Sequence, residues 1–270
     1  MKVARAVALG FLALVCFSSM AAGWISPTHF ETQNRNAILV APCRTYPLGT
    51  DDLGRDLLSR LLYGSRVTLL LAPASALVAT GIALLVGSLA GVFGGLVRVG
   101  LHRVIDLFLS IPWLFLLLIV RAMLPLNLSP AYSVLTTFLV LGTLGWASSA
   151  RVLSESVTSI CGTEYIMLSR LQGVTAVRRL TRHIFPNFWH LIVAQFWICV
   201  PVFIVSEANL GLLGLGIGEP LPSWGNLLHQ LENYDRVVSH PWLLTPLFVV
   251  VLFLVSIQVS FTSFSKRLTS

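Results

Sequence analysis

Six long apolar stretches decide what this chain can fold into. They lie at about residues 6–26, 67–92, 104–124, 131–150, 191–213 and 243–263. A helix needs about 20 mostly apolar residues to cross a bilayer, and it satisfies its own backbone hydrogen bonds, as a segment in lipid must. Hydrophobic residues make up 56% of the chain and charged residues only 11%, a balance that water-soluble domains do not show. The sequence therefore predicts an all-α integral membrane protein with six transmembrane helices.

The net charge of +7 sorts by side of the membrane. With the N-terminus inside, the cytoplasmic ends and loops carry eleven Lys and Arg residues against Glu155 and Glu164, whereas the outer loops carry seven cations against seven acidic residues. Cytoplasmic loops of membrane proteins are enriched in Lys and Arg. This distribution accounts for the positive charge without nucleic acid as a partner, and it predicts that both termini are cytoplasmic.

The first apolar stretch is open to two interpretations. Residues 2–24, KVARAVALGFLALVCFSSMAAGW, start with basic residues and end with small ones, as a signal peptide does. Cleavage of residues 1–23 is therefore one possibility, whereas the length of the apolar run favours an uncleaved signal anchor. We expect residues 1–66 to form this helix and an outer loop. Residues 67–265 then form the transmembrane domain, with a cytoplasmic loop at 151–190.

The outer loop ends in the segment YPLGTDDLGRDLLSRLLYGSR, residues 46–66. Wound as a helix, it separates its side chains into two halves. One half holds Leu53, Leu57, Leu58, Leu61 and Leu62, and the other Asp52, Arg55, Asp56, Ser59 and Arg60. This pattern predicts an amphipathic helix in the headgroup interface, either as an anchor or as a lid or docking surface for an outside partner.

A basic segment, EYIMLSRLQGVTAVRRLTRHIFPNF at residues 164–188, separates two of the apolar stretches. Glu164 suits the positive N-terminal end of a short helix, and Gly173 suits the position just past its C-terminus. A second helix is expected over 174–185, because apolar and basic residues fall on opposite arcs there. Pro186 disfavours helical geometry at Phe185 and is well suited to begin the next helix. Composition alone is consistent with a basic loop that fixes topology and touches anionic lipid.

Two acidic residues lie within the apolar stretches, where an ionisable group costs about 2.5–3.5 kcal/mol on insertion scales. Asp106 follows Arg103 closely, and pairing with that arginine at the interface is the structural alternative to a transport role. Glu207 precedes Asn209 and a glycine-rich end. We expect Glu207, Asn209 and Asp106 near a translocation path, with a buried hydrogen bond between helices as the rival interpretation for Glu207.

Several kinds of active site are missing from the sequence. The only lysines are Lys2 and Lys266, and neither belongs to a G-x-x-x-x-G-K-[ST] phosphate-binding loop. The spans carry no Ser–His pair at catalytic spacing, no paired aspartates and no His-Glu-x-x-His zinc motif. The four cysteines lack paired spacing, and His229 and His240 are lone loop histidines. We expect a non-catalytic chain with no cofactor and no metal site.

The chain resembles the permease subunits of the dipeptide, oligopeptide and nickel ABC importers. The resemblance begins at residues 47–66 and continues through GSLAGVFGG (87–95), RVIDLFLSIPWL (103–114) and SEANLGLLGLGIGEPLPSWGNLL (206–228). It implies the type I ABC importer permease fold and a multi-pass subunit in a bacterial inner membrane. It also implies partners: a homologous permease chain, two ATPase subunits that hydrolyse the ATP, and an external solute-binding protein. Peptides are the expected cargo, with nickel and other small solutes as alternatives.

The same resemblance assigns the basic segment to ATPase coupling. Glu-Tyr, a glycine nine residues after the Glu, and a basic run ending in His-Ile-Phe-Pro-Asn are similar to the cytoplasmic loop through which such permeases contact their ATPases. The first short helix is then the coupling helix. The implied coupling residues are Glu164, Tyr165, Gly173, His183 and Pro186.

Other positions follow from the resemblance or depart from it. Leu168 and Ser169 stand where the family has small residues, often alanine, and Gln172 stands where it has leucine. The outer mouth, where a solute-binding protein docks, is implied at Pro222, Ser223, Trp224 and Gly225. Trp224 beside a proline also suits the interfacial aromatic belt. A stand-alone channel or secondary transporter without an ATPase partner is the alternative function.

Overall fold

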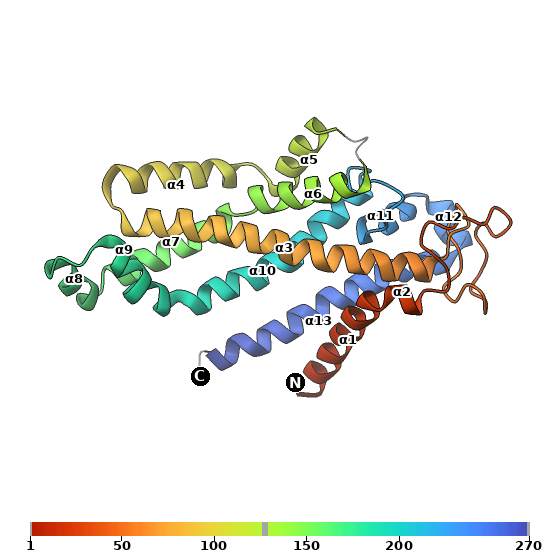
Figure 1. Ribbon diagram of the computed structural model, residues 1–270, viewed down its shortest axis with the longest axis horizontal. Helices are drawn as coiled ribbons and strands as arrows, with labels where there is room; N and C mark the ends of the chain where they lie inside the picture. The colour runs from red at the N-terminus through yellow and green to blue at the C-terminus, as the bar shows by residue number, and fades with distance from the viewer. Residues whose placement is uncertain (1, 126–128, 269–270) are drawn as a thin grey trace. The chain divides into compact units, whose positions relative to one another are not determined.

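The apolar stretches are mostly helical in a computed structural model that describes residues 2–125 and 129–268 (Figure 1). Contacts between Cα atoms divide the chain into two compact units. The first unit comprises Met1–Ala72, Ala122–Thr137 and Ile204–Ser270, and the second comprises Pro73–Arg121 and Phe138–Phe203. Each unit therefore collects segments that are far apart in sequence.

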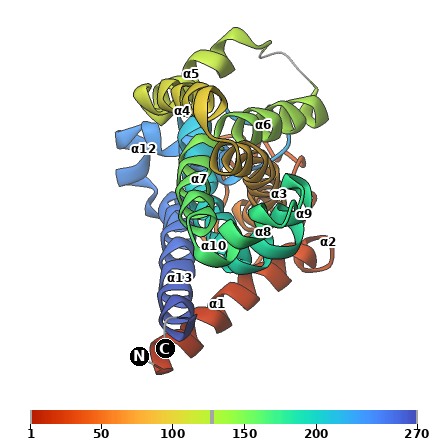
Figure 2. The same ribbon diagram turned by 90° about the vertical axis from the view of Figure 1, so that its left-hand side faces the viewer.

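The first unit contains both ends of the chain. Its elements are α1 (Lys2–Met20), α2 (Ala22–Ile25), the start of α3 (Leu57–Val92), the start of α6 (Pro130–Leu144), the end of α10 (Phe185–Leu212), α11 (Trp224–His229), α12 (Tyr234–Ser239) and α13 (Thr245–Leu268). Short 3₁₀ turns at Gln230–Glu232 and Pro241–Leu244 link the last three helices. The first and last long helices, α1 and α13, lie side by side (Figures 1 and 2).

The second unit contains the middle of the chain. It holds most of α3, then α4 (Gly95–Ser110), most of α5 (Trp113–Met123), the end of α6 (Pro130–Leu144), α7 (Ala147–Cys161), α8 (Glu164–Leu171), α9 (Ala176–Arg179), a π-helical turn (Leu180–Ile184) and most of α10. Glycines bring α3 close to α7. A Cβ added at Gly87 would lie 2.8 Å from the Ala150 carbonyl oxygen, and one at Gly91 would lie 2.6 Å from Val157 Cβ.

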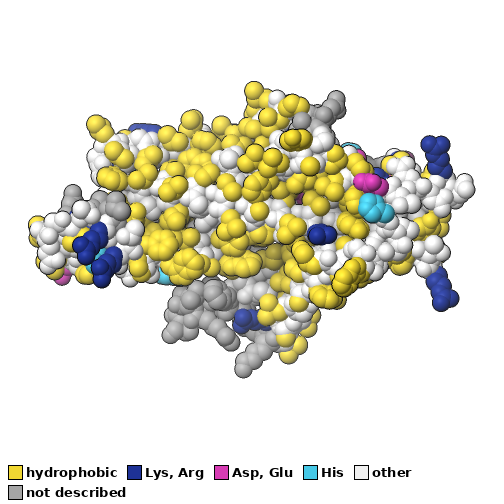
Figure 3. Space-filling model, in the orientation of Figure 1, with side chains coloured by type: hydrophobic (Ala, Val, Ile, Leu, Met, Phe, Trp, Pro, Cys, Tyr) yellow, Lys and Arg dark blue, Asp and Glu magenta, His cyan; other side chains and the backbone are white. Residues whose placement is uncertain are grey.

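The helices confirm the prediction of an all-α membrane protein. Five helical stretches among the described residues are long and apolar enough to cross a membrane, and a bent pair brings the number to as many as six. They are Val3–Met20, Leu57–Val92, Pro130–Cys161, Leu180–Leu212 and Pro241–Phe261, with Gly95–Ser110 and Trp113–Met123 as the bent pair. Hydrophobic side chains cover most of the face drawn in Figure 3, as lipid contact requires.

The third span differs from its prediction. Residues 104–124 were expected to form one helix, whereas α4 and α5 meet at an 85° bend. Ile111, between them, has extended backbone angles of φ −92° and ψ 126°. Because the ring of Pro112 clashes with helical geometry at the preceding residue, the proline explains why the helix ends there.

The amphipathic helix predicted over residues 46–66 was wrong in its first half. Residues 46–56 form turns, and α3 begins only at Leu57. Gly49 and Gly54 have φ angles of +80° and +72°, which a right-handed helix excludes. The Asp51 carboxylate accepts backbone N–H bonds from Leu53 and Arg55, each at 2.9 Å, and so stabilises a turn instead of a helix.

The polar half of that segment is buried rather than directed at headgroups. Arg55, Asp56, Ser59 and Arg60 are all buried. Asp56 caps α3, because its Oδ2 accepts the Ser59 N–H at 2.8 Å. The leucine pattern alone therefore did not reveal that both sides of the segment are covered.

The close approach of α3 to α7 generates a stability prediction. In Gly87→Ala the new methyl meets a backbone carbonyl that cannot rotate away, so we expect a loss of about 1–3 kcal/mol, read as a lower melting temperature in detergent. Gly81, on the same helix, has nothing within 4 Å of an added Cβ. Gly81→Ala is therefore the matched control and should not lower the melting temperature. Equal melting temperatures for the two variants would contradict this account of the packing.

Candidate functional site

The short helix predicted to begin at Glu164 is present as α8, Glu164–Leu171. Gly173 follows it with a φ angle of +75°. The Val174 N–H donates to the Ser169 carbonyl at 3.2 Å, a bond that spans five residues and typically closes a helix whose next residue is left-handed. Glycine is favoured at such a residue because it has no Cβ to clash. The turn at Gly173 thus ends α8 where the sequence indicated.

One side of α8 is apolar and exposed. Met167, Leu168 and Leu171 are all exposed, Leu171 to 84%, whereas Ile166 and Ser169 are buried. Positions 167 and 168 lie four and three residues before position 171, so all three fall on one side of a helix. An exposed apolar cluster of this kind typically marks a surface that a partner covers.

Two of the predicted coupling residues touch each other. The Tyr165 hydroxyl contacts His183 Nδ1, and the two rings meet edge to face with centroids 5.3 Å apart. His183 lies in the π-helical turn, and its carbonyl accepts a bond from Asn187 Nδ2 at 2.7 Å. These contacts connect α8 directly to the start of α10.

The break expected at Phe185 and Pro186 does not occur. Residues 176–212 are helical without interruption, with Phe185 at φ −51° and ψ −46°. Instead the helix widens, and the Phe185 N–H donates to the Leu180 carbonyl five residues back. A proline within a helix lacks an N–H and crowds the carbonyl four residues before it. A π-helical turn just before Pro186 relieves this crowding without ending the helix.

The arginines of this segment face outward. Arg178 and Arg182 are exposed and Arg179 is half-buried. In Figure 3 Lys and Arg atoms gather over the region of α8 and α9. The segment therefore combines a basic surface with the apolar side of α8.

The predicted path residue Glu207 is enclosed within the first unit. It is 1% exposed, and its Oε2 accepts a bond from Thr68 Oγ1 at 3.2 Å. The same hydroxyl accepts the Trp224 N–H at 3.2 Å. A Cβ added at Gly225 would lie 2.8 Å from Glu207 Oε1. Glu207 thus connects α10 to α3 and α11, which agrees with the alternative of a buried hydrogen bond between helices. Asn209, two residues further along α10, is half-buried.

The other predicted path residue, Asp106, has a different partner from the one suggested by sequence. Its carboxylate pairs with Arg151 on α7 rather than with Arg103, and both side chains are partly exposed. Arg103 is three positions away on the same helix, but α4 packs against α7. The pair therefore joins two helices, which a sequence does not show.

The residues predicted at the outer mouth are buried. Pro222, Ser223, Trp224 and Gly225 all lack exposed surface. The prediction that Trp224 belongs to the interfacial aromatic belt is wrong. Its Nε1 donates to Ser65 Oγ at 2.8 Å, and its ring packs on Phe253 with ring centroids 5.2 Å apart. Close glycine contacts explain the burial: a Cβ at Gly211 would lie 2.3 Å from the Gly225 backbone.

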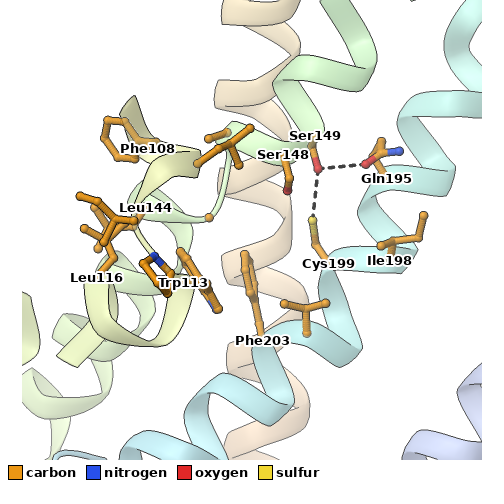
Figure 4. Close-up of a pocket in the computed structure, with 16 residues that line it drawn as sticks. Phe108, Trp113, Leu116, Leu144, Ser148, Ser149, Gln195, Ile198, Cys199 and Phe203 are labelled. Carbon is orange, nitrogen blue, oxygen red and sulfur yellow. Dashed lines mark hydrogen bonds between the residues drawn. The ribbon is translucent and has the colours of Figure 1, made fainter. Parts of the chain in front are cut away.

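A cavity in the second unit was not anticipated. It has a volume of about 360 Å³ and lies at the bend between α4 and α5, against α7 and α10 (Figure 4). Phe108, Trp113 and Phe203 form much of its apolar wall, and Ser149 donates to Gln195 Oε1 at 3.0 Å on the polar side. Pro112 is the sequence feature that could have indicated this cavity, because the cavity lies at the bend where this proline ends α4.

A charged cluster was also missed. Arg55 and Arg60 form ion pairs with Asp51 and with Glu219, which lies in the segment between α10 and α11. Glu219 lies more than 150 positions from both arginines in sequence, so no local pattern indicated its contact with them. Among the described residues, no group of three or more His, Cys, Asp and Glu side chains is placed to hold a metal ion.

Comparison with known proteins agrees with this geometry. The family model described as binding-protein-dependent transport system inner membrane component matches residues 83–270. The oligopeptide transport system permease protein OppC of Mycobacterium tuberculosis (strain H37Rv) is 32% identical over 253 residues, covering 93% of this chain and 85% of that protein. The dipeptide permease protein DppC of Bacillus subtilis is 28% identical over 233 residues, covering 86% of this chain and 70% of that protein.

A solved structure has the same fold. A chain of the MetNI methionine ABC transporter, in an inward-facing conformation, matches with a TM-score of 0.58 at 20% identity. The match covers 78% of this chain and 96% of that chain. Fold, family model and relatives agree: the chain belongs to the family of binding-protein-dependent transport system inner membrane components.

Proposed function

We propose that this chain is the permease subunit of an ATP-driven peptide importer and that α8 is its contact with the ATPase. The observation that carries the proposal is α8 itself, a short helix with an exposed apolar side at the end of a basic segment. A stand-alone channel or secondary transporter has no use for such a surface. Peptide is the cargo best supported, because the oligopeptide and dipeptide permeases are among its relatives.

The proposed assembly has further chains. A second permease chain, homologous to this one, completes the pathway, two ATPase subunits bind on the cytoplasmic side, and a solute-binding protein delivers cargo from outside. The charge distribution supports the orientation, because the arginine-rich segment belongs on the cytoplasmic side. ATP hydrolysis falls to the ATPase subunits, since this sequence has no phosphate-binding loop.

The proposed mechanism is alternating access. ATP binding draws the ATPase subunits together and moves α8. The contact between Tyr165 and His183 transmits that movement to the π-helical turn, and from there to α10. Gly173 fixes the orientation of α8, because the left-handed turn determines where the chain leaves the helix. Glu164 belongs to the same contact, at the first turn of α8.

The roles of the remaining polar residues follow from their positions. Glu207 and Asn209 are proposed to border the path at the end of α10, with Glu207 holding α3 and α11 against it. Asp106 is proposed to act through its pair with Arg151. Residues 222–225 are buried, which favours a place in the wall of the outer mouth over direct contact with the docked protein.

The turn at Gly173 yields a prediction about coupling. Gly173→Val forces a β-branched residue into a left-handed conformation, at a cost of about 1–2 kcal/mol, and should reorient α8. We expect ATP hydrolysis by the assembled complex to continue while uptake of a labelled tripeptide into proteoliposomes falls. Gly173→Asn is the control, because asparagine tolerates left-handed geometry, and nothing lies within 4 Å of an added Cβ. Normal coupled uptake in Gly173→Val would refute this role.

The apolar side of α8 yields a prediction about assembly. Leu171→Asp places a charge in the proposed contact, so co-purification of the ATPase subunits with this chain should fall about tenfold or more. Thr175→Asp adds the same charge at an exposed position beyond the turn and should leave co-purification unchanged. If both variants retain the ATPase equally, α8 is not the contact, and a transporter without an ATPase regains support.

Glu207 yields a prediction that separates transport from folding. Gln keeps the shape of the side chain and an oxygen for the Thr68 hydroxyl but removes the charge, so Glu207→Gln should assemble normally and change the rate of peptide uptake. Glu155→Gln removes an exposed charge of the same kind and should change neither. An unchanged uptake rate in Glu207→Gln would leave the residue with a structural role only.

A further inference from the structure

Two buried arginines lie on the side of the first unit that the charge distribution places outside. The Arg60 side chain is 0% exposed and the Arg55 side chain is 5% exposed. A buried cation is costly unless it is paired and hydrogen-bonded. The carboxylates around these two side chains therefore decide what the cluster does.

Asp51 is a fixed partner of the arginines. Its side chain is fully buried, and Oδ1 accepts the backbone N–H groups of Leu53 and Arg55. Its Oδ2 lies 2.6 Å from Arg55 Nε, 3.6 Å from Arg60 Nε and 3.4 Å from Gln230 Nε2. A carboxylate held by so many donors inside a turn does not leave without unfolding that turn.

Glu219 is a different kind of partner. Its Oε2 lies 2.9 Å from Arg55 Nη1 and its Oε1 lies 2.8 Å from Arg60 Nη2, so one carboxylate bridges both guanidinium groups. A third bond at 3.3 Å joins Oε2 to Arg60 Nη1. Yet the Glu219 side chain is 50% exposed and belongs to the non-helical segment between α10 and α11. It enters the cluster from the solvent side.

The charges show what Glu219 contributes. Arg55 and Arg60 carry two positive charges, and Asp51 balances one of them. The neighbouring acids are engaged elsewhere: Asp56 caps α3, and Asp52 pairs with Arg236 at 2.8 Å. Glu219 therefore balances the second positive charge. The two guanidinium groups that surround its carboxylate can bind any other carboxylate that reaches the same position.

We propose that Arg55 and Arg60 form a binding site for the C-terminal carboxylate of a peptide and that Glu219 occupies this site in the present structure. The choice of a peptide rests on the proposed function, because every linear peptide carries this group whatever its side chains. The arginines contact the terminal carboxylate and not the peptide side chains, so the site makes no demand on peptide sequence. Displacement of Glu219 breaks the ion pairs that join the segment between α10 and α11 to Arg55 and to Arg60 of α3.

The tethered carboxylate is a strong competitor. An attached group acts at an effective concentration in the millimolar range or above, so a free peptide binds weakly while Glu219 is present. Removing the Glu219 charge should therefore strengthen peptide binding, whereas removing the charge of an ordinary structural ion pair only destabilises the protein. A gain in peptide affinity after removal of the Glu219 charge therefore distinguishes a ligand site from a structural ion pair.

The test is equilibrium binding of radiolabelled tri-alanine to the full chain in nanodiscs. We expect Glu219→Gln to bind tri-alanine about tenfold more tightly than the unaltered chain, and to prefer it over tri-alanine amide, which lacks the carboxylate. Glu232→Gln is the matched control, since Glu232 is an exposed acid of the same unit that pairs with His229; it should bind as the unaltered chain does. Adding Arg60→Lys to Glu219→Gln removes the planar fork and should abolish the gain.

Each outcome bears on the proposal. Equal binding of the acid and the amide by Glu219→Gln, or no gain over the unaltered chain, overturns it. Acetate binding as tightly as tri-alanine overturns the peptide as the ligand, since the site would then be a general carboxylate site. Because the measurement needs no ATPase, a failure here while the unaltered chain co-purifies with an ATPase rejects this site alone. Failure of the unaltered chain to co-purify with any ATPase rejects the proposed function alone.

Discussion

A backbone surrounded by lipid has to make its own hydrogen bonds, and the rest of this structure depends on that constraint. It forces the apolar stretches into helices. A departure from regular α-helical geometry is then tolerated only where the backbone N–H and C=O groups find other partners. Three departures stand out: the extended residue Ile111 before Pro112, the π-helical turn before Pro186, and the left-handed Gly214 after α10. Ile111 lines the cavity between α4, α5, α7 and α10, and the π-helical turn contains His183, which contacts Tyr165.

The sequence predicted the elements well because their signals are local. Apolar length located the spans, and the spacing of Glu164 and Gly173 located α8 within a residue. The predictions that were wrong concern what a proline does to a helix. A proline indicates that the regular pattern changes, but Pro112 ends a helix whereas Pro186 lies inside one, and the difference depends on whether the preceding turn can widen. In the turn before Pro186 the Phe185 N–H donates to the Leu180 carbonyl, and His183 of the same turn contacts Tyr165.

Buried polar groups were the least predictable feature. The amphipathic pattern of residues 46–66 indicated a polar side, and polar sides usually face water. Here the partners come from the far end of the chain: Glu219 meets Arg55 and Arg60, and Trp224 donates to Ser65. Arginine suits such burial because its guanidinium group binds two carboxylates at once. Tertiary contacts of this range lie beyond any local pattern.

Apolar and basic residues occur together in the segment of residues 164–188. An exposed apolar helix beside a membrane would tend to bury itself in the headgroup region, where no partner could reach it. In α8 that tendency is opposed by two restraints at its ends, one in the backbone and one between side chains. The left-handed turn at Gly173 limits its direction at one end, and the contact of Tyr165 with His183 fixes it to α10. Arg178 and Arg182, both exposed, favour the cytoplasmic side. The apolar side of α8 thereby stays exposed at the stability cost of one strained turn, which glycine keeps small.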